Sequence, residues 1–284
     1  LTNANTETYI AWNWLLGGTP TADNSAGVGA TPTAGSVKIN GANKGSALAG
    51  SIAATRLSAN TTSGISIVTY TGNNSDGATV AHGLTQKPDA IFIKKRADNS
   101  GSGNTGFWIG QHVGLATDPE GDANTFTLST YTNGAIYLND TGAQATYSFD
   151  NQVDGNTDTF VAYCFHNTDF CKVGNYGVSV SGTNGTYVYT GHRPQWLMIK
   201  RADAAGTNWW IWDNKRTPFN LADDALLAND AAAEYENNSA LAIDILSNGF
   251  KMRNTYGDLN ATGSPSNYIY ISLAESPFKY ANAR

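Results

Sequence analysis

The amino-acid sequence predicts an all-β protein of two tandem β-sandwich-like modules with an extended N-terminal arm. Charged residues make up only 14% of the 284 residues, whereas there are 30 glycines and 14 tyrosines. Few charged helix formers, much glycine and many aromatic residues together favour short strands and tight turns. One long stretch also occurs twice. A repeat far longer than a solenoid unit of about 20 to 50 residues indicates two domain-sized modules.

The repeat is clearest at two landmarks that keep their spacing. Tyr70 and Pro88 in the first copy correspond to Tyr176 and Pro194 in the second, and both pairs are 106 residues apart. The copies share strand-like runs at 89–95 and 195–201, aromatic clusters at 107–109 and 209–212, and closing runs at 159–165 and 267–273. The strand-like and closing runs are apolar on both faces, as central strands are. The sequence therefore predicts module one over residues 51–167 and module two over residues 168–284.

The residues ahead of module one predict two further segments. Residues 9–14 resemble the closing runs, so we expect residues 1–16 to form a strand, either the end of a preceding module or a strand exchanged with a neighbouring subunit. Ile10, Trp12 and Trp14 would share one face of that strand and would need a partner sheet. Residues 17–50 are rich in Gly, Ala and Thr, which predicts an arm or linker that lies on another surface.

One helix is expected in module two. Ala, Leu, Asp and Glu concentrate between Leu221 and Glu236, and Asn220 stands where an N-cap residue would. Asn-Gly pairs at 133–134, 184–185 and 248–249 are turn signals.

Charge and hydropathy exclude two kinds of partner. The net charge is −6, and the sequence lacks the clustered Lys and Arg that neutralise phosphates, so we expect no nucleic acid. No stretch approaches the about 18 apolar residues of a membrane span, so we expect no membrane insertion. Cys164 and Cys171 are too few for a disulfide framework, and whether they form a bridge stays open.

Two patterns that could carry catalysis lack part of what the chemistry needs. Residues 101–106 match Gly-x-Gly-x-x-Gly, but residues 107–109 are strand material and not the helix that a dinucleotide site requires. Cys164 and His166 would share one face of a strand, but no oxyanion hole accompanies them. We therefore expect no catalytic residues and no cofactor.

An acidic stretch is the candidate metal site. Oxygen donors alternate in it as they do in a calcium loop, at Asp118, Glu120, Asp122 and Asn124. Ala123 and Ser129 stand where an EF-hand loop has Gly and Glu, so the stretch is a calcium-loop candidate without the full motif. We expect no other metal site.

The aromatic clusters are the candidate ligand-binding residues. Trp209, Trp210 and Trp212 put large rings on both faces of one expected strand, and Trp108 stands in the matching cluster of the first copy. Exposed flat rings beside Asn and Asp bind sugars by stacking and hydrogen bonding. The alternative is that these rings fill the core and a subunit interface.

Three stretches carry a resemblance to a known family: residues 70–98, 176–216 and 274–284. They include Trp-Trp-x-Trp-Asp-x-Lys-Arg at 209–216 and Ala-Glu-Ser-Pro-Phe-Lys-Tyr-Ala-Asn-Ala-Arg at 274–284. With these motifs the chain resembles virion proteins of tailed phages, common in marine phages, that are described as tail-fibre-like or structural. The resemblance implies a place on the extracellular phage particle.

The resemblance and the tandem modules together imply a non-enzymatic structural protein of the virion, most simply a fibre or appendage subunit. Its expected partners are copies of itself in a homo-oligomer such as a trimer, other virion proteins, and host cell-surface polysaccharide as a ligand. Two alternatives stay open. One is a capsid decoration or cement protein, and the other is a carbohydrate-binding or glycan-degrading module.

Overall fold

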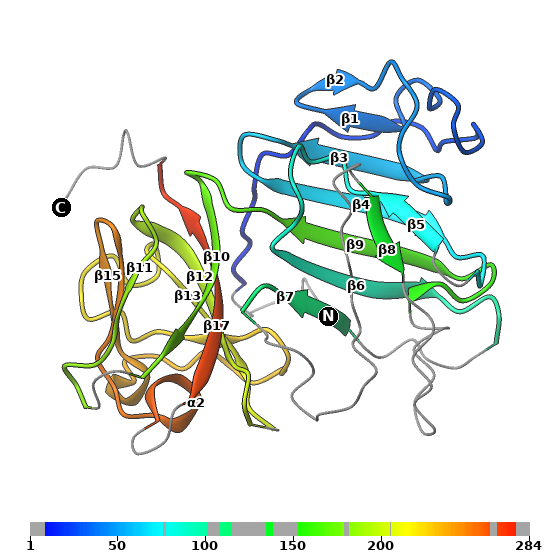
Figure 1. The fold of residues 1–284 in the computed structure, drawn as a ribbon. Helices are drawn as coiled ribbons and strands as arrows, with labels where there is room; N and C mark the ends of the chain where they lie inside the picture. The colour runs from blue at the N-terminus through cyan, green and yellow to red at the C-terminus, as the bar shows by residue number, and fades with distance from the viewer. Residues whose placement is uncertain are drawn as a thin grey trace.

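The computed structural model describes residues 9–75, 78–101, 108–114, 135–138, 153–178, 182–204, 206–261 and 266–276. In these ranges nearly all regular structure is strand, which confirms the predicted all-β fold class. The short helical elements include η1 (Ser239–Leu241) and α2 (Gly257–Asn260). Figure 1 shows two bodies, each formed around one large sheet, with the N-terminal segment passing between them.

The first body is built around a seven-stranded sheet with the order β2-β1-β3-β4-β9-β6-β7. Its strands are β1 (Val37–Ile39), β2 (Ala42–Asn43), β3 (Arg56–Asn60), β4 (Ile65–Thr71), β6 (Ala90–Ala97), β7 (Trp108–His112) and β9 (Thr159–Phe165). Only the β1–β3 pair is parallel among these neighbours. A second, two-stranded sheet of β5 (Ala78–Ala81) and β8 (Ala135–Leu138) completes this body, and β5 contributes Val80 to the buried cluster beneath the large sheet.

The second body is built around a five-stranded sheet with the order β10-β17-β12-β13-β14. Its strands are β10 (Cys171–Gly177), β12 (Pro194–Arg201), β13 (Trp209–Asp213), β14 (Leu226–Leu227) and β17 (Asn267–Ala274). A three-stranded sheet of β11 (Tyr187–Tyr189), β16 (Gly249–Met252) and β15 (Ile243–Leu246) packs on it. The side chains between the two sheets form a second core, which contains Trp212, Ile243 and Phe250.

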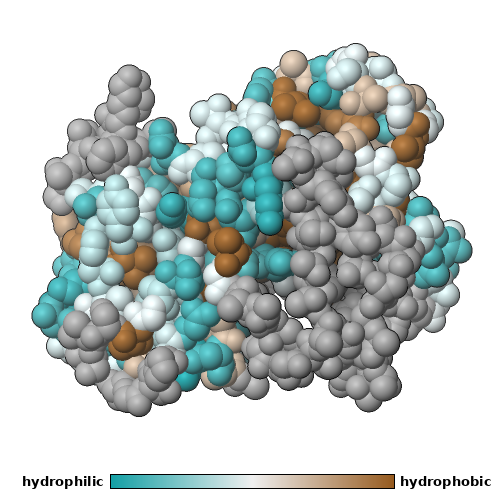
Figure 2. Space-filling model, in the orientation of Figure 1, coloured by the Kyte–Doolittle hydropathy of each residue, from teal (hydrophilic) through white to brown (hydrophobic). Residues whose placement is uncertain are grey.

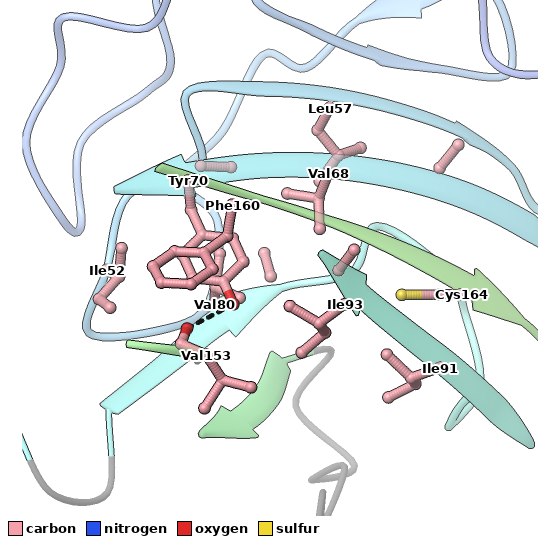
Figure 3. Close-up of a cluster of buried hydrophobic side chains, with 14 of the residues drawn as sticks. Ile52, Leu57, Val68, Tyr70, Val80, Ile91, Ile93, Val153, Phe160 and Cys164 are labelled. Carbon is pink, nitrogen blue, oxygen red and sulfur yellow. Dashed lines mark hydrogen bonds between the residues drawn. The ribbon is translucent and has the colours of Figure 1, made fainter. Parts of the chain in front are cut away.

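The repeat in the sequence is visible in the order of the strands and in one detail of packing. The order β4-β9-β6-β7 in the first body matches β10-β17-β12-β13 in the second. The Tyr70 hydroxyl donates to the Val153 carbonyl oxygen at 2.7 Å, and the Tyr176 hydroxyl donates to that of Leu259 at 2.8 Å, in both cases 83 residues further along the chain. Figure 3 shows the first of these bonds, with the Tyr70 ring stacked on Phe160. Tyr176 stacks on another aromatic ring in the same way.

The two bodies pack on each other through the sheet faces that point away from their own cores. This third cluster includes Ile65 and Phe165 from the seven-stranded sheet, and Val173 and Ile271 from the five-stranded sheet. A hydrogen bond joins the His112 Nε2 atom to the Tyr270 carbonyl oxygen at 3.1 Å across the same boundary. Since apolar burial and polar contacts both cross the boundary, the bodies are held together by the kind of packing found within a domain.

The predicted strand at residues 9–14 is wrong for the described part of the N-terminal segment, which carries no strand from residue 9 to residue 16. The Trp12 and Trp14 rings instead pack edge-to-face on Trp196, with centroids 6.4 and 5.4 Å away. The Trp12 Nε1–H group donates to the Asp213 Oδ2 atom at 3.2 Å. Ring packing and a side-chain hydrogen bond thus take the place of the expected strand pairing.

Residues 17–50 also differ from the expected arm or linker, because they fold onto the first body and extend its sheet. Val37 is buried in the first core, and β1 pairs with β3. A Cβ atom at Gly17 would lie 2.2 Å from the Ala59 carbonyl oxygen, so only glycine allows the chain to pass this close to β3. Backbone pairing and close approach therefore secure a segment that has few apolar residues.

The predicted helix at Leu221–Glu236 is wrong. The structure has the short strand β14 there, paired with β13, and isolated bridges join Ala222 to Ile243 and Ala225 to Tyr235. Both alanines are buried in the second core. Burial and pairing with neighbouring strands override the helix propensity of alanine, which is a weak determinant.

Candidate binding surface

Two of the four tryptophans predicted as ligand-binding residues belong to the core. Trp210 and Trp212 alternate with outward-facing residues on β13 and point together into the second core, with ring centroids 6.4 Å apart. Trp212 is fully buried and Trp210 nearly so. Neither ring has a free face for a ligand in this conformation, so the structure supports the core alternative for this pair.

Trp209 points to the opposite face of β13 and lies where the two bodies meet. Its ring is half-buried and meets Phe92 of β6 edge-on, with centroids 5.5 Å apart. This geometry is a favourable aromatic contact. Trp209 therefore contributes to the packing between the bodies.

Trp108 of β7 is the one predicted tryptophan that presents a ring to solvent, with 57% of its surface exposed. It stands opposite Lys94 of β6, whose Nζ atom lies 5.8 Å from the ring centroid, within cation–π range. The Tyr163 ring of β9 is tilted by 41° to the indole, at 5.8 Å between centroids. We call these three residues, Lys94, Trp108 and Tyr163, the Trp108 surface.

The Trp108 surface follows from strand alternation. In β6, Ile93 points into the first core, and Lys94 must therefore point to the other face. The ring faces of Trp108 and Tyr163 can pack on the C–H groups of a sugar, and the Lys94 ammonium group can donate hydrogen bonds beside them. The sequence prediction missed Lys94 and Tyr163. The signal that could have grouped them with Trp108 is the pairing register of the adjacent strands β7, β6 and β9.

The other predicted positions do not form a site among the described residues. The calcium-loop candidates Asp118, Glu120, Asp122 and Asn124 lie outside the described residues. In the part of the chain that the structure describes, no group of three or more His, Cys, Asp and Glu side chains could hold a metal ion. No helix there is long and apolar enough to span a membrane.

The two cysteines are both buried and both free, which answers the question that the sequence left open. Cys164 lies in the first core (Figure 3), where burial raises the pKa of its thiol to about 12. Since the thiolate is the reactive form, this thiol is inert at neutral pH. His166 forms its contact with Asp89, at 2.9 Å between Nδ1 and Oδ2.

A family model described as a domain of unknown function (DUF7483) matches residues 34–277. The chain belongs to the DUF7483 family. No curated protein and no solved structure matches the chain. The DUF7483 match begins just before β1 and ends after β17, so a single family unit includes both large sheets and the residues of β1 and β2.

Proposed function

We propose that this DUF7483 protein is a structural subunit of a phage particle, most simply of a fibre or appendage, and that it acts by binding and not by turnover. The motifs at residues 70–98, 176–216 and 274–284 support this proposal through their resemblance to tailed-phage virion proteins. The packed boundary between the bodies also supports it. A unit whose two modules share a buried cluster is suited to transmit force along a particle.

The observation that carries the proposal is an exposed apolar segment next to a rigid anchor. Ile10, Trp14 and Leu15 are exposed, Leu15 by 84%, whereas Trp12 between them is held by Trp196 and Asp213. Clustered large apolar side chains in water mark contact sites on other proteins. We infer that this segment contacts a second copy of the chain in a homo-oligomer. Figure 2 shows further hydrophobic residues at the surface over the end that carries β1 and β2.

The location of the protein on the particle tests the proposal. Antibodies raised against the purified chain, coupled to gold, are expected to label tails or appendages in negative-stain images of purified phage. Mass spectrometry of the same particles is expected to find the chain at a copy number per particle that fits the symmetry of the tail. Gold on the head would favour a decoration protein instead, and particles without the chain would contradict a virion role altogether.

The Trp108 surface favours host glycan as a second ligand of the same subunit. An exposed indole beside a tyrosine ring and a lysine has the chemistry that recognises a sugar ring. This role is compatible with a structural one, because the surface lies on the first body whereas Trp14 packs on the second.

Two tryptophan variants separate these roles. Trp108→Ala is expected to weaken retention on immobilised host polysaccharide by about tenfold, equivalent to about 1.4 kcal/mol, and to leave the oligomer intact. Trp14→Ala is expected to lower the mass measured by light scattering to that of the monomer and to leave polysaccharide retention unchanged. If neither variant affects its own readout, both surfaces are wrongly assigned; if Trp108→Ala alone has no effect, the glycan role fails and the assembly role stands.

A further inference from the structure

A buried lysine and a buried aspartate touch at one end of the seven-stranded sheet. Lys95 is the sixth residue of β6, and Asp158 lies immediately before β9. The Nζ and Oδ2 atoms are 2.6 Å apart, and the side chains are only 1% and 0% exposed. Lysine is almost never fully buried, and removing two charges from water costs several kcal/mol per ion. An ion pair with so little exposure to water therefore needs a chemical explanation.

Two backbone amides hold the other carboxylate oxygen. The Asn99 and Ser100 N–H groups both donate to the Asp158 Oδ1 atom, each at 2.7 Å. Paired backbone donors on one oxygen form the arrangement that stabilises the oxyanion of a tetrahedral intermediate. If a nucleophile attacked the Asp158 carboxyl carbon, Oδ1 would already be in place to carry the negative charge.

A second carboxylate and a hydroxyl group complete the cluster. The Asp98 Oδ1 atom lies 3.6 Å from the Lys95 Nζ atom and 3.2 Å from the Ser100 hydroxyl. The same hydroxyl lies 2.9 Å from the Asp158 Oδ2 atom. Asp98 is therefore placed to take a proton from Lys95, and Ser100 is placed to pass protons on to Oδ2. The Phe160 ring lies 5.9 Å from Nζ and limits the access of water.

We propose that Lys95 and Asp158 become joined by an isopeptide bond that the folded protein forms by itself. The Lys95 ammonium group gives a proton to Asp98, which passes it through Ser100 to the Asp158 Oδ2 atom, and the neutral amine then attacks the carbon of the neutral carboxyl group. The Nζ–Cγ bond forms while Oδ1 carries the charge between its two N–H donors. The Cγ–Oδ2 bond then breaks, and Oδ2 leaves as water with two protons that came from Nζ by way of Asp98 and Ser100. Asp98 ends ionised, as it began.

The energetics favour the product once the site is closed. The reaction removes two opposite charges from a dry interior and releases one water molecule, whereas the ion pair keeps both charges desolvated. Before reaction, burial raises the pKa of Asp158, but hydrogen bonds from Lys95 and Ser100 outweigh burial and lower it. The starting state is thus an ion pair, and proton transfer to Asp98 is the step that must come first.

The second body supplies an internal comparison. Lys95 stands opposite Phe160 in the sheet, and Arg201 stands opposite Tyr268 at the same place in the other sheet. Ser266 precedes Tyr268 by two residues, as Asp158 precedes Phe160, and the Arg201 Nη2–H group donates to the Ser266 Oγ atom at 3.2 Å. Guanidinium stays charged and serine has no carboxyl carbon, so this bond can form only in the first body.

The bond would tie β6 to the start of β9 and close a covalent loop over residues 95–158. A cross-link of this kind stabilises a protein chiefly by restricting the unfolded chain, and more so for long loops. The inference concerns the stability of the first body. It stands whether or not the chain proves to be a phage fibre subunit.

Mass spectrometry of the purified full chain tests the bond. We expect the intact mass to be lower than the sequence mass by one water molecule. Residues 97–171 contain no Lys or Arg and Lys172 follows them, so trypsin releases residues 97–172 as one peptide. In the cross-linked protein this peptide should carry the dipeptide Lys95-Arg96 as a branch on Asp158, because trypsin does not cleave after an acylated lysine.

Three variants make the test specific. Lys95→Arg should restore the full sequence mass, and Asp98→Asn, which keeps both reacting groups, should leave most of the protein unlinked. Lys94→Arg removes the neighbouring lysine on the opposite face and should keep the loss of water. A water loss that persists in Lys95→Arg would come from elsewhere, such as cyclisation at Asp154-Gly155, and would overturn the proposal. So would the absence of the branched peptide from folded wild-type protein, which decides the question even if a variant fails to fold.

Discussion

Lowering the pH from 7 to 4 is expected to unfold or nearly unfold the protein. Three histidines are buried, and burial lowers the pKa of His82, His112 and His192 from 6.5 to about 4. Each then contributes about 3 kcal/mol to the free energy of unfolding at neutral pH, which is lost by pH 4. Because a domain is stable by only about 5–15 kcal/mol, three such contributions are decisive.

The direction follows from which state binds protons. Above pH 6.5 the histidines are neutral in both the folded and the unfolded chain, and their contribution is complete. Between pH 6.5 and about 4 the histidines bind protons in the unfolded chain but not in the folded chain, so the free energy of unfolding falls with falling pH. Burial acts to raise the pKa of Asp213, but hydrogen bonds such as those from Arg216 outweigh burial and lower it. Protonation of this carboxylate therefore lowers the free energy of unfolding further only below its ordinary pKa of 3.8.

Hydrogen bonding explains why these histidines stay neutral in the folded chain. The Nδ1 atom of His112 accepts the Gly114 N–H group at 2.9 Å, and that of His82 accepts the Leu84 N–H group at 3.1 Å. A proton on Nδ1 would point directly at a backbone donor and break each bond. The bond from His112 Nε2 to Tyr270 then fixes the neutral tautomer at the boundary between the bodies.

Urea unfolding at a series of pH values measures this effect. His112→Gln keeps a hydrogen-bond acceptor and a donor but cannot titrate. The slope of the free energy of unfolding against pH should therefore correspond to the uptake of about one proton fewer on unfolding. His166→Gln serves as the control, since His166 is half-buried beside Asp89, and it should leave the acid transition in place. A free energy of unfolding that stays constant from pH 7 to pH 4.5 would contradict the buried neutral histidines.

The repeated framework could be predicted from the sequence because the duplicated residues have the same structural role. Tyr70 and Tyr176 keep their spacing because each donates a hydrogen bond to a carbonyl 83 residues away within its own body. Apolar runs such as residues 159–165 predicted central strands because both of their faces are buried, one against a core and the other at the boundary between the bodies.

Other features could not be predicted because distant residues decide them. No local signal in residues 17–50 specifies pairing with β3. Ala222 and Ala225 favour a helix by intrinsic propensity, but both are buried in the second core, and this burial overrides the propensity. The tryptophans show the same limit. Alternation separates Trp209 from Trp210, but the sequence does not say which face of β13 meets the core. The cluster of Lys95, Asp98 and Asp158 was not anticipated either, since 63 residues separate its reacting groups.

Trp212→Ala is expected to be among the most destabilising single substitutions in the second body. The side chain is fully buried against Trp210 and the three-stranded sheet, so its removal loses apolar burial and leaves a cavity. Replacements of this kind cost about 3–5 kcal/mol. Unfolding followed by circular dichroism should show this loss at neutral pH, above the range in which the histidines titrate.

Two further variants make the test of Trp212 sharp. Trp108→Ala removes the same side chain from an exposed site and should change the free energy of unfolding by at most about 0.5 kcal/mol. Trp212→Phe keeps much of the ring, and the indole Nε1–H group that it removes has no hydrogen-bond partner among the described residues, so it should cost far less than alanine. Equal losses at Trp108 and Trp212 would mean that the aromatic residues of β7 and β13 are assigned to the wrong faces. A small loss for Trp212→Ala would place that ring outside the core and return it to the candidates for ligand binding.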